Sequence, residues 1–140
     1  MQLRPPSPTA RAPSRNFTGD IYVTPIYTGQ EPSRMVVALV RFTPGARTNW
    51  HSHDVGQTLH VTEGVGLVGI RDGSVLRVRA GDTVICPVGE EHWHGAGADT
   101  FMSHLAMLES LPGGEDPTTW QEPLSEEDYQ AYSHLDPDHT

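Results

Sequence analysis

The sequence contains no lysine, and only one of its 140 residues, Cys86, is a cysteine. Without lysine no side chain can form a Schiff base or serve as the cation of a lysine-dependent phosphate loop, which excludes pyridoxal-phosphate enzymes. A single cysteine excludes an internal disulfide and a cysteine-rich zinc site. No apolar run approaches the roughly 18 residues that a membrane-spanning helix needs.

Basic residues are missing from the last third of the chain. All nine are arginines, the last is Arg79, and they balance the nine acidic residues of positions 1–104. Positions 105–140 hold the other nine acids, so this segment alone gives the net charge of −9. Nucleic acids and anionic membranes need a basic patch, so we expect neither as a partner. The first 15 residues lack the apolar stretch of a secretory signal, and we expect a cytoplasmic protein.

Twelve prolines and 14 glycines divide the chain into short segments and argue against a bundle of long helices. Residues 1–15 hold four prolines and few apolar side chains, which predicts a flexible arm. We expect residues 16–110 to form one barrel and residues 111–140 an acidic C-terminal segment. That segment is expected to contain one short helix from about Glu126 to Ser133, capped by Ser125, with Tyr129 and Tyr132 on one face.

Short strands separated by turns are predicted from residue 17 to residue 108, a pattern typical of an antiparallel sandwich or barrel. The expected strands cover residues 21–26, 35–42, 57–61, 65–71, 75–78, 83–86 and 101–108. Glu63-Gly64 is expected to turn the chain between two of these strands. Asp72-Gly73 predicts a type I′ hairpin turn, in which both residues have positive φ. The sequence therefore predicts an all-β fold with one short C-terminal helix.

Four of the eight histidines form two His-x-His pairs, His51 with His53 and His92 with His94. Residues i and i+2 of a strand point to the same face, so each pair projects its imidazoles together. Gln57 follows the first pair after a bend and can bring its amide oxygen to the same point. Three imidazoles and one oxygen that converge inside a barrel make a divalent-metal site with open positions.

Two stretches resemble the two motifs of the cupin family. The first reads Gly45, five residues, His51, one residue, His53, three residues, Gln57, six residues and Gly64, with Gln57 replacing the usual glutamate. The second reads Gly81, five residues, Pro87, one residue, Gly89, two residues and His92, with Ala96 at the position of the motif's final asparagine. The resemblance covers about residues 16–108. It implies a cupin (double-stranded β-helix, or jelly-roll) barrel whose metal ligands are His51, His53, Gln57 and His92.

Residues 42–53, 56–59, 92–96 and 102–106 resemble a narrower group, the small bacterial single-domain cupins that include manganese-dependent hydroxynitrile lyases. In that group the histidines that match His94 and His104 line the pocket beside the metal. The resemblance implies one divalent metal ion, with manganese as the first expectation. Iron, zinc, nickel and cobalt accept the same donors.

His104 shares one strand face with Met102 and Ala106, which would place an imidazole in an apolar cup if that face points inward. Unperturbed imidazole titrates near pH 6.5, which suits proton transfer at neutral pH. We therefore expect His104 to be a general base and His94 an orienting donor or second base. A neutral glutamine ligand leaves a charge of about +2 on the site, which favours redox-neutral Lewis-acid chemistry.

The first functional hypothesis is a metal-dependent lyase that cleaves or forms cyanohydrins, as the resemblance implies. One alternative is another metal cupin, such as a dioxygenase, cyclase or isomerase, and a second is a non-catalytic cupin that holds a small ligand. The expected partners are a small-molecule substrate and further copies of the chain. A homodimer or homotetramer is expected because edge strands such as residues 21–26 tend to pair with another chain.

Overall fold

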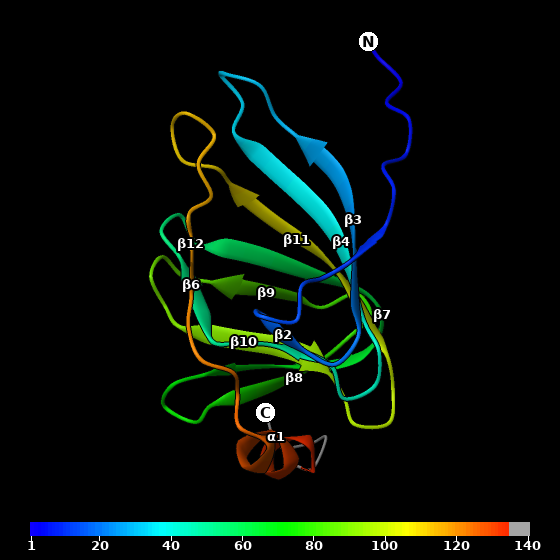
Figure 1. Cartoon of the computed structure of the whole chain (residues 1–140), viewed down its shortest axis with the longest axis vertical. Coiled ribbons are helices and arrows are strands. Elements are labelled where there is room, and N and C mark those ends of the chain that lie inside the picture. The colour runs from blue at the N-terminus through cyan, green and yellow to red at the C-terminus, as the bar shows by residue number, and fades with distance from the viewer. Residues whose placement is uncertain (135–140) are drawn as a thin grey trace.

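The computed structural model describes residues 1–134, which form twelve strands and one helix. The strands belong to one strongly curled sheet, and the helix lies outside it at one end (Figure 1). This confirms the all-β barrel with a short C-terminal helix. Within residues 1–134, no helix is long and apolar enough to cross a membrane.

One wall of the barrel is an antiparallel sheet in the order β3, β4, β11, β7 and β9. These strands cover Ile21–Thr28, Met35–Phe42, Met102–Glu109, Gln57–Ile70 and Thr83–Cys86. The short strand β1 (Ala10–Arg11) pairs with the outer edge of β3, so part of the N-terminal arm lies against this wall. Alternate residues of these strands, among them Phe42, Leu59 and Met102, point inward and are buried.

The other wall carries the histidine pairs. It contains β8, the second half of β7, β10, β5 and β2, and β6 and β12 complete it. These strands, apart from β7, cover Val75–Arg79, His92–Ala96, Arg47–Thr48, Phe17–Thr18, His51–His53 and Thr118–Trp120. Strand β6 is three residues long and lies between β10 and β12.

Strand β7 runs unbroken from Gln57 to Ile70, so the turn predicted at Glu63-Gly64 is wrong. Gly64 has a φ of +79°, and a Cβ at this position would collide with the carbonyl oxygen of Phe101. Glycine therefore bends the strand without ending it. Before the bend β7 pairs with β11 and β9, and after it with β10 and β8, so one strand joins the two walls.

The hairpin predicted at Asp72-Gly73 joins β7 to β8 and is confirmed, but its type I′ turn is not. Gly73 has a φ of +90°, whereas no non-glycine residue of the described chain has positive φ. The Asp72 carboxylate instead accepts a hydrogen bond from the Ser74 N–H at 2.8 Å. This side-chain bond stabilises the turn with Asp72 in an ordinary conformation.

Helix α1 covers Glu126–Ser133, as predicted, and the Ser125 hydroxyl accepts a hydrogen bond from the Asp128 N–H at 3.1 Å. Tyr129 and Tyr132 share the face that packs on Trp93, with ring centroids 6.3 and 5.9 Å from the indole. The Tyr129 hydroxyl donates to the Ala96 carbonyl at 2.9 Å. The outward side of β10 therefore holds the helix, and its inward side is free to build a site.

Candidate metal centre

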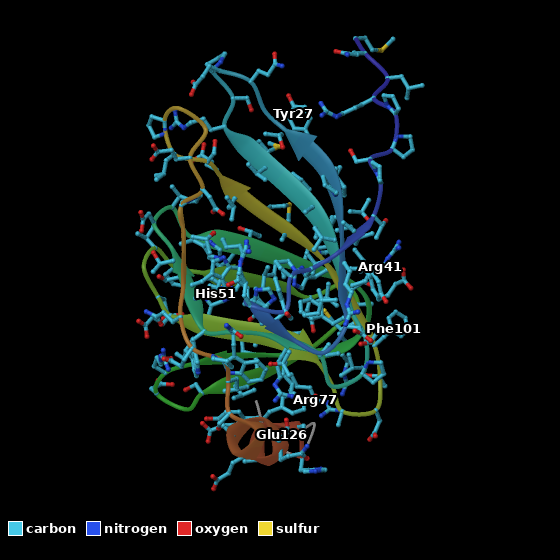
Figure 2. The ribbon with its side chains drawn as sticks, in the orientation of Figure 1. Tyr27, Arg41, His51, Arg77, Phe101 and Glu126 are labelled. Atoms are coloured by element: carbon cyan, nitrogen blue, oxygen red, sulfur yellow. The ribbon has the colours of Figure 1, made fainter. Side chains whose placement is uncertain are left out.

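Three of the predicted histidines meet inside the barrel. His51, His53 and His92 each offer a ring nitrogen, and these atoms lie within 4.8 Å of one another. His51 and His92 are directly opposite each other in the antiparallel pairing of β6 and β10. All three side chains are 1–3% exposed, and His51 points into the interior of the barrel (Figure 2).

Each of these rings is oriented by an oxygen at Nδ1. The Asn49 carbonyl lies 2.9 Å from Nδ1 of His51, and the Glu90 carbonyl lies 3.0 Å from Nδ1 of His92. A carbonyl oxygen only accepts, so these two rings carry their proton on Nδ1 and leave a lone pair on Nε2. The Thr118 hydroxyl, which can donate or accept, lies 2.8 Å from Nδ1 of His53 and orients that ring.

The three converging nitrogens fit a divalent metal ion. Nε2 of His92 is buried and has no hydrogen-bond partner among residues 1–134, which fits an atom that would coordinate an ion. The amide oxygen of Gln57, at the start of β7, lies 3.0 Å from Nε2 of His53. The structure therefore places a neutral oxygen donor beside one of the three nitrogens, that of His53. Imidazole and amide donors suit the first-row divalent metals.

His94 and His104 extend this cluster away from the three ligand candidates. Nε2 of His94 lies 3.3 Å from Nε2 of His51, and Nδ1 of His94 lies 2.9 Å from Nε2 of His104. His104 is 1% exposed, and its ring lies 5.3 Å from that of Phe42. The inward orientation predicted for His104 is thus observed, and His94 stands between His104 and His51.

Burial keeps these imidazoles neutral. It lowers the pKa of His104 to about 4, and together with the neighbouring His92 it lowers the pKa of His53 to about 4. Burial also lowers the pKa values of His51, His92 and His94, and mutual repulsion of the rings adds to the effect at His51 and His94. The pKa of His104 therefore lies below the unperturbed value considered from the sequence, so the ring is neutral at pH 7 and a weaker base than free imidazole.

A cavity of about 490 Å³ opens onto the cluster. Its histidines are His51, His53 and His94, whereas His104 lies behind His94 and does not line it. The opposite wall is apolar and is formed by β3, β4 and β11, with the side chains of Val23, Val36, Ala38, Val40, Ala106 and Leu108. The site thus combines a polar floor with an apolar wall, which suits a small substrate with an oxygenated and a hydrocarbon end.

Two residues of the site were not predicted from the sequence. Thr118 contacts His53, and the ring of Trp120 lies 4.6 Å from that of His51. Both belong to β12, in the segment that the sequence placed outside the barrel. Neither has a spacing relation to the histidines, so only the fold could show their position.

The comparisons with known proteins agree with this geometry. Residues 38–107 match the family described as the cupin domain. An (R)-mandelonitrile lyase from Granulicella tundricola is 40% identical over 122 residues, which cover 87% of this chain and 92% of that protein.

Solved structures show the same fold. A cupin-like protein from Thermotoga maritima is 32% identical, with a TM-score of 0.80 over 94% of this chain and 96% of that chain. The polyketide cyclase RemF from Streptomyces resistomycificus is 22% identical, with a TM-score of 0.62 over 80% of this chain and 78% of that chain. At that identity the likeness extends to the fold alone.

Proposed function

The chain belongs to the cupin family, and from this premise we propose that it is a metal-dependent lyase that cleaves or forms cyanohydrins. The observation that carries the proposal is the histidine cluster: three oriented nitrogens beside two further imidazoles at the floor of a half-apolar cavity. The 40% identity to a mandelonitrile lyase over most of both chains supports the same reaction class.

We assign the metal to His51, His53, Gln57 and His92, with manganese as the first choice among the divalent ions. When bound, the ion would act as a Lewis acid on the substrate oxygen. Because Gln57 is neutral, it would leave the +2 charge of the ion uncompensated, which favours a redox-neutral reaction.

The proton of the substrate hydroxyl is taken by the His94–His104 pair. His94 lines the cavity, and its Nδ1 lies 2.9 Å from Nε2 of His104. In this structure the lone pair on Nε2 of His51 makes Nε2 of His94 the donor of their contact, so Nδ1 of His94 accepts from Nε2 of His104. To act as a base, each ring must carry its proton on Nδ1 instead. His94 then accepts the substrate proton at Nε2 and passes its Nδ1 proton to Nε2 of His104, the terminal base. Since burial lowers the pKa of both rings, both are neutral and able to take part at pH 7.

The bond changes balance without an oxidant. In cleavage, the O–H bond of the cyanohydrin breaks and its proton goes to the histidine pair. The electron pair on oxygen forms the carbonyl, and the C–C bond to the nitrile breaks with its electron pair on cyanide. The histidine pair returns the proton, which gives hydrogen cyanide and an aldehyde. The apolar wall that includes Val36, Ala38 and Leu108 accommodates the hydrocarbon part of that aldehyde.

A metal screen tests the proposal. Purified protein is stripped with a chelator, loaded separately with Mn²⁺, Fe²⁺, Co²⁺, Ni²⁺ or Zn²⁺, and assayed for benzaldehyde release from mandelonitrile. We expect activity with at least one ion and none in the stripped protein. Inactivity with all five ions, at full metal loading, would contradict the lyase. Oxygen uptake with phenolic compounds by the same samples would then favour a dioxygenase.

A further inference from the structure

The first histidine pair lies on a strand that the C-terminal segment completes. Strand β6 pairs with β12 at all three of its residues, with His53 opposite Thr118 and His51 opposite Trp120. On its other side β6 pairs with β10 at a single position, His51 opposite His92. Without β12, the strand that carries two of the proposed metal ligands would be an almost unpaired edge (Figure 1).

Residues 116–122, which we call the C-terminal strap, are fixed to this region by main-chain and side-chain bonds. The Asp54 N–H donates to the Pro117 carbonyl at 3.0 Å, and the Trp50 N–H donates to the Glu122 carbonyl at 3.0 Å. The Gln121 N–H donates back to the Trp50 carbonyl at 2.8 Å. The strap therefore brackets the His51–His53 strand at both ends.

Thr118 differs from the oxygens that orient the other two rings. The carbonyls of Asn49 and Glu90 come from residues two positions before their histidines, so each of these rings is oriented by its own strand segment. The support of His53 instead comes from a hydroxyl 65 residues further along the chain. The orientation of this one ring depends on whether the strap is in place.

The hydroxyl also suits both states of the His53 ring. The Gln57 amide oxygen only accepts, so its 3.0 Å contact places the ring proton on Nε2, and Nδ1 then accepts from Thr118. For Nε2 to bind an ion, the proton must lie on Nδ1 and be donated to Thr118. A hydroxyl can donate in the first state and accept in the second, whereas a carbonyl can only accept.

We propose that the C-terminal strap is a working part of the metal centre, in which Thr118 positions His53 and strap docking and metal binding favour each other. The proposal rests on the proposed metal site. It extends the centre beyond residues 38–107, the part of the chain that matches the cupin domain. By thermodynamic linkage, if the docked strap raises metal affinity, then bound metal must stabilise the docked strap by the same factor.

The first test measures metal affinity. Thr118→Val removes the hydroxyl and keeps the shape of the side chain, whereas Thr118→Ser keeps the hydroxyl. Thr119→Val is the control, because it changes the exposed neighbour on the same strand. Mn²⁺ and Co²⁺ affinities are measured by competition with a chelator. Loss of a group that orients a metal-bound histidine costs about 10- to 100-fold in affinity. We expect this loss for Thr118→Val, near-wild-type affinity for Thr118→Ser and no change for Thr119→Val.

The second test needs no variant. Hydrogen–deuterium exchange of peptides that cover residues 116–122 is compared in the wild-type protein with and without Mn²⁺. We expect Mn²⁺ to slow exchange in the strap, with a smaller effect in Thr118→Val. The visible spectrum of the Co²⁺-loaded variant should also change, because it reports the geometry of the ligands.

The outcomes separate this inference from the proposed function. If wild-type protein binds no divalent ion, the proposed metal site fails, and the strap proposal fails with it. If the wild type binds the ion but Thr118→Val binds it equally well, the strap proposal alone is overturned. Unchanged exchange of the strap on metal binding would also overturn it.

Discussion

Nε2 of His104 lies 2.9 Å from Nδ1 of His94, and both rings are buried beside the proposed metal ligands. His94 lines the cavity and His104 lies behind it. This relationship connects the buried His104 imidazole to the cavity through a second imidazole. Neither ring belongs to the three-histidine group that can hold an ion, but Nε2 of His94 lies 3.3 Å from Nε2 of His51, which does belong to it.

Replacement of His104 should reduce activity without loss of the metal. A positioned base contributes about 10²- to 10⁴-fold in rate, so His104→Ala should lose cyanohydrin cleavage by roughly that factor. Metal content is measured on the same sample by elemental analysis. His60→Ala is the matched control, since His60 contacts Thr83 away from the cavity. If His104→Ala is as active as the wild type, the base is elsewhere and His94 becomes the candidate.

Replacement of a ligand should abolish metal binding. His51→Ala or His92→Ala removes one of three converging nitrogens, and neither variant should retain stoichiometric metal. In the wild type, added metal should raise the melting temperature, because the ion binds the folded chain alone. The same addition should leave the melting temperature of either variant unchanged. Full metal content in either variant would show that the ligands are assigned incorrectly.

Acid should destabilise the metal-free protein before its carboxylates protonate. His104 has a pKa of about 4 in the folded chain, whereas the unfolded chain binds that proton near pH 6.5. The unfolded state therefore binds more protons between these values, so stability is full above pH 6.5 and falls as the pH drops towards 4. The loss from His104 alone is about 3 kcal/mol once the pH lies below 4, and about 2.5 kcal/mol of it falls between pH 7 and pH 4.5. Urea unfolding of chelator-treated protein at pH 7 and pH 4.5 measures it.

His104→Gln provides the control for this pH effect, since it removes one titrating ring. Its free energy of unfolding should depend less steeply on pH between 6.5 and 4 than that of the wild type. Equal pH dependence in the two proteins would show that His104 does not carry the depressed pKa.

We also propose that the chain forms a homodimer or homotetramer through the edge of β3. Strand β1 covers this edge only opposite Tyr22 and Val23, and Ile26 further along the strand is 45% exposed. Light scattering at micromolar concentration should give a multiple of the 15.3 kDa chain mass, and Ile26→Asp should shift it towards the monomer. A wild-type monomer would contradict this proposal.

The sequence predicted the features that follow from local spacing. The i, i+2 histidine pairs, the bend before Gln57 and the cap at Ser125 each depend on neighbouring residues, and the structure shows all of them. It did not predict that β7 continues through Gly64, because a glycine with positive φ marks a turn and a bend equally well. Whether the strand continues depends on its partner strands, and those are distant in the sequence.

The sequence did not predict the contribution of β12 either, because it too depends on a partner strand that is distant in the sequence. Thr118 is an ordinary threonine in an acidic, proline-containing segment, and its significance comes from a contact with His53. The sequence likewise could not predict that one chain of contacts joins His51, His94 and His104, because these contacts depend on the register of β10 and β11. The lowered pKa values of the clustered histidines follow from their burial, which cannot be deduced from the spacing of residues in the sequence.

The most direct test of the account relates activity to bound metal in a single titration. Chelator-stripped protein is loaded stepwise with Mn²⁺, and benzaldehyde release from mandelonitrile is measured at each loading beside the metal content of the same sample. We predict a rate that starts at zero, rises in proportion to bound metal and levels off at one ion per chain, with His92→Ala flat throughout. A rate that is independent of metal content, or equal in His92→Ala, would contradict the account.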